Sequence, residues 1–530
     1  MQVFDIVIAL LLGGAALAAV ARRFGAPYPA LVALAGAGLA LVPGVPTMVL
    51  DPELALALFV APVLADAAFD SSPRDLRANW RPIASLALGA VALTVMVVAT
   101  AARLLVPEMP WAAAIALGAI VAPPDAAAAT TVLKQLRPPH RLLVILEGES
   151  LFNDASALLT YRLAVGAAIG GFLSPWSVFP TLLTVTAGSI ALALVLARLM
   201  LAVMARIHDV ATAVVVQFCG TFGVWILAEE LHLSAIIVMV VFAMTASRRA
   251  PEIMPARIRI PSWAVWEVAV FVLNVLAFIL VGFQLKSIAA RAGGATGAQY
   301  ALIATAVCVA AILARIVWVT GAAAISRWRC RPRPGGKPGR RDAVGLTGRG
   351  AIVVGWSGMR GTVTLAAALA LPTDFPFRDL ILATAFGVTL GTLVVQGLTL
   401  RPLLKWLRLE DDGSVDREIR LARLEALRAA VAAAATCPGA ESAALVRHRY
   451  ELQLRRAEAG LAGDGASADG GQPTGDNDAA VVRAAMEAQR RKLVALRADG
   501  TIGDAAYQRI EEELDWTELG WAQVVGPAQA

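Results

Sequence analysis

Residues 146–154 of the chain read LEGESLFND and lie inside an apolar stretch that runs from about Leu142 to Phe172. An ionised carboxylate at the centre of a bilayer costs about 3 kcal/mol unless it is paired, neutralised or hydrated. This stretch nevertheless keeps Glu149 and Asp154 well inside it. We therefore expect a membrane helix whose acidic side chains are functional.

The composition of the chain places the stretch in a membrane protein. Hydrophobic residues make up 58% of the sequence and charged residues 16%, with a mean hydropathy of +0.68. Apolar runs of roughly 17 to 28 residues recur from Val3 to Leu407, and each is long enough to cross about 30 Å of hydrocarbon. Thirteen such runs start near residues 3, 28, 53, 83, 111, 142, 177, 210, 233, 262, 299, 350 and 379. The sequence predicts an all-α polytopic membrane protein, and twelve spans is the nearest alternative because the second and ninth runs are short.

Basic residues in the loops predict the orientation of these spans. Alternate loops carry clusters such as Arg22 and Arg23, Arg74 to Arg81, Arg248 to Arg259 and Arg327 to Arg349, while the loops between them hold almost no Lys or Arg. The positive-inside rule then puts the amino terminus outside and the carboxyl tail in the cytoplasm of a cell-membrane protein. The net charge of +6 follows from these loops and says nothing about nucleic acid. Membrane lipid is the expected partner, and no nucleic acid is expected.

The composition changes after the last span. Residues 1–408 form the predicted transmembrane domain, and residues 409–530 a cytoplasmic tail rich in Ala, Arg, Glu and Leu at helical spacing. A stretch of Gly, Asp, Ala and Ser near 463–478 predicts a flexible linker within the tail. Charged runs there indicate solvated helix faces or, alternatively, a regulatory element.

Two acidic residues are expected at the same depth of the membrane. Asp125 precedes the basic turn between the fifth and sixth spans by about a dozen residues, and Asp154 follows it by about as many, which is ~20 Å along either helix. An antiparallel pair of spans would therefore let them share one cavity. A structural ion pair is the alternative interpretation for each.

The fifth span is predicted to be broken at Asp125. Pro123 and Pro124 remove two amide donors, so the freed carbonyls need other partners, and a monovalent cation can be one. Gly355 to Gly361 predicts a similar break in the twelfth span. Broken helices at matching places in two halves of a chain are typical of transporters built from inverted repeats, although a simple kink would leave the same pattern.

Hard oxygen ligands surround Asp154 in the sequence. Ser150 lies one helical turn before it, and Asn153 lies beside it. Carboxylate, hydroxyl and backbone oxygens suit a small alkali cation. Asp154 is therefore the expected carrier, for which a proton and a cation compete.

The remaining charged residues at depth have supporting interpretations. Arg315 lies in the middle of the eleventh span and needs an acidic partner, for which Glu149 is the candidate. Arg360 is expected to neutralise the carbonyl ends of the broken helices or an acid of the fifth span. Asp66 on the third span either lines an inner funnel or pairs near the cytoplasmic end. The four cysteines show no paired spacing, and no resident cofactor or metal centre is expected.

These motifs together resemble the monovalent cation:proton antiporter-1 family, in particular its bacterial sodium/proton exchangers. Residues 147–154 are similar to its Asn-Asp signature, residues 123–126 to its broken-helix motif, and residues 355–371 to its later Gly-Arg-Gly helix. The resemblance implies that Asp154 carries the ion and the proton, that Ser150 is a ligand, that Glu149 and Arg315 form a supporting pair, and that the protein is a homodimer.

The sequence departs from the family at two places. Many members have Thr before the acid of the fifth span and Pro after it, where this chain has Pro124 and Ala126. A hydroxyl ligand is thus missing, and the backbone carbonyl of Pro124 is the expected substitute. In the third span Pro62 and Asp66 stand where many members have two prolines and a Glu.

The expected function is electroneutral exchange of Na⁺, or Li⁺, for H⁺. Exchange of K⁺ for H⁺ by the same architecture is the first alternative, and a cation channel is a weaker one. The sequence contains neither an HExxH nor a Gly-x-Ser-x-Gly motif, and an enzyme is not expected.

Overall fold

The computed structural model describes residues 2–24, 27–40, 54, 56–136, 138–170, 175–291, 294–329, 348–409, 411 and 413–436, with further isolated residues between 448 and 516. Every regular element among them is a helix. The chain divides into two compact units, Met1–Asp412 and Gly413–Ala530.

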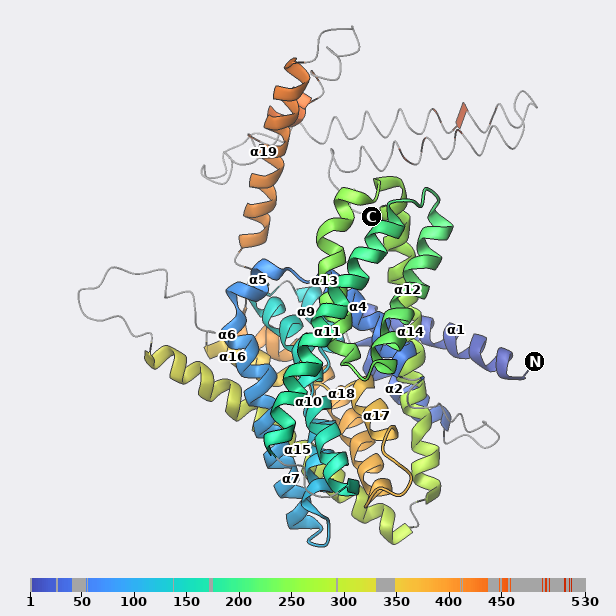
Figure 1. Cartoon of the computed structure of the whole chain (residues 1–530), viewed down its shortest axis with the longest axis vertical. Coiled ribbons are helices and arrows are strands. Elements are labelled where there is room, and N and C mark those ends of the chain that lie inside the picture. The colour runs from blue at the N-terminus through green and yellow to red at the C-terminus, as the bar shows by residue number, and fades with distance from the viewer. Residues whose placement is uncertain are drawn as a thin grey trace. The chain divides into compact units, whose positions relative to one another are not determined.

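The first unit contains the helices from α1 to α18 (Figure 1). In chain order its elements are α1 (Gln2–Phe24), α2 (Tyr28–Ala40), the π-helical turn η1 (Leu56–Val60), α4 (Ala61–Asp70), α5 (Pro73–Ala78), α6 (Trp80–Ala84), the π-helical turn η2 (Ser85–Ala90), α7 (Val91–Leu105), α8 (Trp111–Val121), α9 (Ala126–Leu136), α10 (His140–Gly170), α11 (Pro175–Met204), α12 (Val210–Glu230), α13 (Ala235–Ile253), α14 (Ala256–Arg291), α15 (Gly294–Arg329), α16 (Gly348–Trp356), α17 (Thr362–Leu369) and α18 (Arg378–Leu407).

Six of the described helical segments are long and apolar enough to cross a membrane by themselves: Trp80–Leu105, Leu183–Met204, Val210–Glu230, Ala256–Leu280, Gly297–Trp328 and Arg378–Leu407. Shorter apolar helices are Ile8–Ala21, Tyr28–Leu39 and Trp111–Val121. These helices agree with the predicted multi-span, all-helical architecture. The total of thirteen spans stays a prediction.

The helices of the first unit pack in two groups. In the group named here the site bundle, α7 packs on α8 and α15, α10 packs on α8, and α15 packs on α16 and α18. In the group named here the flanking bundle, α14 packs on α2, and α13 packs on α11, α12 and α4. The site bundle has its own core of buried small and branched residues, including Val98, Leu117 and Ile303.

Close helix packing in the site bundle depends on small residues. A Cβ atom on Gly118 of α8 would lie 2.7 Å from the carbonyl oxygen of Val95 on α7, so only glycine allows this approach. Membrane helices associate through such contacts because the surrounding lipid is as apolar as their side chains. The tight packing gives the broken helices a rigid frame.

Both predicted breaks are present. Residues 122–125 interrupt the fifth span between α8 and α9, and residues 357–361 interrupt the twelfth between α16 and α17. The second break starts later than the sequence indicated, because α16 continues through Gly355 to Trp356. Gly355 packs instead against the backbone of Ile316 on α15, 3.4 Å from where its Cβ would be.

The second unit begins with α19 (Ser414–Thr436). Arg428 on this helix makes ion pairs with Glu425, at 2.9 Å, and with Glu458, at 3.4 Å. The predicted linker near 463–478 lies outside the described residues.

Candidate functional site

The two breaks cross each other. The backbone N–H of Asp125, in the first break, donates a hydrogen bond to the carbonyl oxygen of Met359, in the second, at 2.6 Å. A Cβ atom on Gly361 would lie 1.7 Å from Oδ2 of Asp125. The Asp125 carboxylate is therefore held directly against the backbone of the second break, where only glycine leaves room for it.

Arg360 links the second break to the first broken helix. This side chain is completely buried, and its Nε donates a hydrogen bond at 2.9 Å to the carbonyl oxygen of Val121, the last residue of α8. Its Nη1 donates to the carbonyl of Gly358. The carbonyl end of a helix carries partial negative charge and lacks intrahelical partners, so a guanidinium stabilises it. The sequence left two partners open for Arg360, the carbonyl end of a broken helix or an acid of the fifth span. In the structure Arg360 binds the carbonyl end of α8.

Arg315 does the same for the other broken helix. Its Nε and Nη2 donate to the carbonyl oxygen of Val354, in the last turn of α16, at 3.2 and 3.1 Å. The same guanidinium forms a two-pronged ion pair with Glu149, in which Nη2 lies 2.8 Å from Oε2. Glu149 and Arg315 are 1% and 2% exposed. The pairing indicated by the sequence is thus present, and it leaves no net charge at this place.

Asn153 connects α10 to the first break. Its Nδ2 donates a hydrogen bond at 3.1 Å to the carbonyl oxygen of Pro124, one of the carbonyls freed by the prolines. A carbonyl oxygen has two lone pairs, so that of Pro124 keeps one for another partner. The Oδ1 of Asn153 is buried and accepts no hydrogen bond from a described residue.

Asp154 is buried next to Asn153 on α10, with 8% of its surface exposed. It lies close enough to Asp125 for the two carboxylates to interact electrostatically. Two like charges repel strongly where water is scarce, and either a bound proton or a bound cation relieves the repulsion. Together these two acids therefore favour binding of one positive charge.

Two further predicted site residues, Ser150 and Asp66, lie on different helices. Ser150 is half-buried on α10, one turn before Asp154. Asp66 is half-buried on α4 of the flanking bundle, where its charge interacts with those of Asp70, Lys134 and Glu267. The structure therefore brings Asp125, Asn153, Asp154, Arg360 and the Glu149–Arg315 pair together around the crossing, and places Asp66 in a separate charged group.

One polar contribution was missed by the reasoning from sequence. The Oγ1 of Thr392 on α18 accepts a hydrogen bond from the backbone N–H of Arg360 at 3.0 Å. Thr389, Thr392 and Gln396 are all completely buried and are spaced three and four residues apart along α18. Polar residues at helical spacing in an apolar span are the signal that could have found them. Among the described residues, no three His, Cys, Asp or Glu side chains are grouped as a metal centre would need.

Two broken helices that cross beside buried carboxylates define a class of protein, the secondary active transporters of ions and small solutes. The chain belongs to one family of that class, the sodium/hydrogen exchangers: the profile described as "Sodium/hydrogen exchanger, transmembrane" matches residues 6–406. It is accordingly a secondary transporter and not an enzyme.

Individual relatives agree with this assignment. An uncharacterized Na⁺/H⁺ exchanger of Mycobacterium tuberculosis is 30% identical over 522 residues, which cover 96% of this chain and 94% of the relative. The low-affinity Na⁺/H⁺ antiporter NhaS1 of Synechocystis is 29% identical, over 75% of this chain and 74% of its own. The sodium, potassium, lithium and rubidium/H⁺ antiporter of Bacillus subtilis is 30% identical over 67% of this chain and 54% of its own.

A solved structure has the same fold. The sodium proton antiporter MjNhaP1 of Methanocaldococcus jannaschii superimposes with a TM-score of 0.58, covering 77% of this chain and 99% of that protein, at 16% sequence identity. The likeness extends the all-helical, multi-span architecture to this chain.

Proposed function

We propose that this protein exchanges Na⁺ or Li⁺ for H⁺ across the cell membrane, through competition of the cation and the proton for Asp154. The observation that carries the proposal is the burial of Asp154 beside Asp125 at the crossing of the two broken helices. A buried carboxylate with a like-charged neighbour favours occupation by a positive charge at all times. Release of a proton is then coupled to binding of a cation.

The cation would be held by oxygen atoms of α10 and of the first break. The carboxylate of Asp154 supplies the charge, with the Ser150 hydroxyl and the remaining lone pair of the Pro124 carbonyl as neutral ligands. Asn153 fixes that carbonyl by its hydrogen bond at 3.1 Å. Water would complete the coordination of an alkali ion, which prefers such hard ligands.

Charge counting favours electroneutral exchange. Asn153 does not titrate, and Glu149 is occupied by the guanidinium of Arg315. Asp154 then loses one proton for each cation that it binds. Under this proposal a membrane potential does not drive the exchange.

Exchange of K⁺ for H⁺ is the second candidate, supported by the names of two Bacillus relatives. The Bacillus subtilis antiporter is named for sodium, potassium, lithium and rubidium. In the present chain Pro124 offers a backbone carbonyl at the break and no side-chain hydroxyl, so the ligand set there differs from that of many family members.

The remaining assignments belong to the same proposal. Residues 1–408 are the transport domain, built from two inverted repeats of which the broken fifth and twelfth spans are corresponding elements. Residues 409–530 are a cytoplasmic tail, the amino terminus lies outside, and two copies of the chain form a homodimer. Loop charges support the orientation.

The test is exchange in proteoliposomes. The purified full-length chain should move protons in response to Na⁺, Li⁺ or K⁺ gradients, and Asp154→Asn should abolish the movement while the protein still folds. Glu230→Gln removes an exposed acid at the end of α12 and serves as the control. Exchange that survives in Asp154→Asn, or a proton current that follows the membrane potential, would contradict the carrier role or the electroneutral stoichiometry, respectively.

A further inference from the structure

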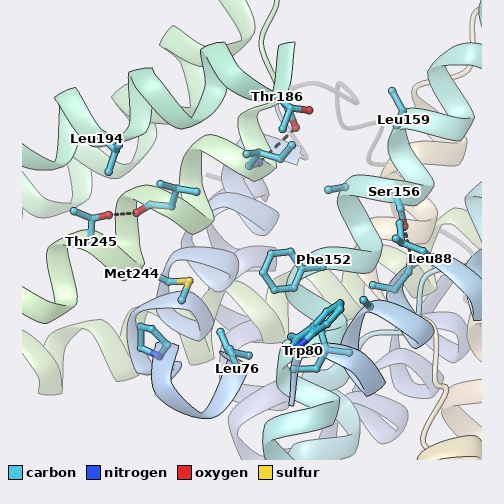
Figure 2. Close-up of a pocket in the computed structure, with 18 of the residues that line it drawn as sticks. Leu76, Trp80, Leu88, Phe152, Ser156, Leu159, Thr186, Leu194, Met244 and Thr245 are labelled. Carbon is cyan, nitrogen blue, oxygen red and sulfur yellow. Dashed lines mark hydrogen bonds between the residues drawn. The ribbon is translucent and has the colours of Figure 1, made fainter. Parts of the chain in front are cut away.

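A long groove runs along the face of α10 that points away from the crossing. Its volume is 1040 Å³, and its walls come from α5, α6, η2 and α10 on one side and from α11 and α13 on the other. Figure 2 shows Phe152, Ser156 and Leu159 of α10 facing Leu194, Met244 and Thr245 across this space. Asp154 is not among the residues that line it, so the groove is distinct from the candidate ion site.

The groove is apolar along its length and basic at one end. Leucine, isoleucine, valine, alanine and aromatic side chains form most of its lining. The exposed side chains of Arg77, Arg198, Arg248 and Arg249 line the end that the positive-inside rule assigns to the cytoplasm, and Arg162 lies toward the other end. None of the described residues that line the groove is an Asp or a Glu.

The basic end carries charge that the described protein does not neutralise. Arg77, Arg248 and Arg249 make no ion pair with a described residue. Arg77 comes from α5 on one wall, whereas Arg248 and Arg249 come from the last turns of α13 on the other. Trp80, which is 60% exposed, stands at the same end, as tryptophan does at the headgroup level of a bilayer.

The length of the groove fits a lipid chain. From Ser234 to Arg248 along α13 it extends for about 21 Å at ~1.5 Å per residue. One leaflet contributes about half of the ~30 Å hydrocarbon core, so an acyl chain and its headgroup together span such a length. Anionic headgroups are attracted to clusters of basic residues at the membrane surface.

We propose that this groove binds one anionic phospholipid, with an acyl chain along α10 and the phosphate held between Arg77 of α5 and Arg248 and Arg249 of α13. The lipid bridges the site bundle and the flanking bundle. The lipid lies against the opposite face of α10, the helix that carries Asp154. Phe152 and Ser156, which line the groove, are each two positions from Asp154 in the sequence.

Lipid retention by the purified full-length chain tests the proposal. The delipidated protein is incubated in detergent with equimolar phosphatidylglycerol and phosphatidylcholine of identical acyl chains, and retained lipid is counted by native mass spectrometry. We expect at least a fivefold preference for phosphatidylglycerol. The triple variant R77Q/R248Q/R249Q should bring the preference close to one.

A matched control and a filled groove complete the experiment. R23Q/R206Q/R257Q removes three exposed arginines from the same set of loops but outside the groove, and it should keep the preference. Val241→Trp fills the apolar part with the arginines intact, and it should reduce phosphatidylglycerol retention at least threefold.

Three results would overturn the proposal. Equal loss of preference in R23Q/R206Q/R257Q would mean that the overall charge of that membrane face selects the lipid. Unchanged retention in Val241→Trp would place the lipid elsewhere. Displacement of phosphatidylglycerol by an equal concentration of glycerol phosphate would mean that the arginines bind a free phosphate group and that the groove is not a lipid site.

Discussion

Removing one partner of the buried Glu149–Arg315 pair should cost more free energy of unfolding than removing both partners together. Each side chain is at most 2% exposed, and the guanidinium also holds the Val354 carbonyl. Removing one member of such a pair leaves an unpaired buried charge and typically costs about 3–5 kcal/mol. Glu149→Gln and Arg315→Met should each lower the free energy of unfolding by that amount.

The double variant separates this explanation from a loss of packing alone. In E149Q/R315M no buried charge remains, and the Val354 carbonyl and the amide at position 149 lose their partners, at a combined cost of about 3 kcal/mol. From about 4 kcal/mol for each single variant, the sum would be about 8 kcal/mol, so the double variant should show a coupling of about 5 kcal/mol.

The assay is equilibrium unfolding of the purified protein in mixed micelles, followed by tryptophan fluorescence. Glu147→Gln is the control on the same helix, because its partner Lys134 lies 3.4 Å away in a pair that is 62% and 33% exposed. Such an exposed pair is worth about 0–1 kcal/mol. A cost for Glu149→Gln no greater than that of Glu147→Gln, or strictly additive single variants, would refute the reasoning.

Three further outcomes are expected. Gly361→Ala should reduce Na⁺-driven proton movement in proteoliposomes at least tenfold. The added Cβ would lie 1.7 Å from the Asp125 carboxylate and displace it. An unchanged rate would show that the crossing tolerates a different position of Asp125. Thr392→Val should destabilise the protein by about 1–3 kcal/mol in the unfolding assay, because the buried N–H of Arg360 loses its acceptor at 3.0 Å. Thr305→Val on α15 is the comparison, because its exposed hydroxyl donates to the carbonyl of Ala301 within the same helix. Lowering the pH should raise the apparent KM for Na⁺ with little change in the maximal rate, because protons compete with the cation for Asp154. A maximal rate that falls at constant KM would exclude simple competition.

Local chemistry explains why much of the site could be read from the sequence. Pro123 and Pro124 cannot continue a helix, wherever the chain folds, so the break before Asp125 was evident from residue types alone. A buried arginine in an apolar span needs a carboxylate or backbone carbonyls as partners, and Glu149 was the acid at a suitable depth for Arg315. The second break was less well located, since glycine permits an interruption without requiring one and α16 continues through Gly355.

By itself the sequence determined a helical membrane protein with buried acids, two interrupted spans and an Arg315–Glu149 pair, because the cost of polar groups in lipid acts on each residue independently of the fold. Tertiary structure alone decided which broken end each arginine stabilises, Val121 for Arg360 and Val354 for Arg315, and that Gly361 lies against Asp125. Those contacts join residues more than thirty positions apart. The two arginines bind backbone carbonyls, which every residue carries, and Gly361 presents only its backbone to Asp125. Only the packing of α8, α15 and α16 in space could select among them.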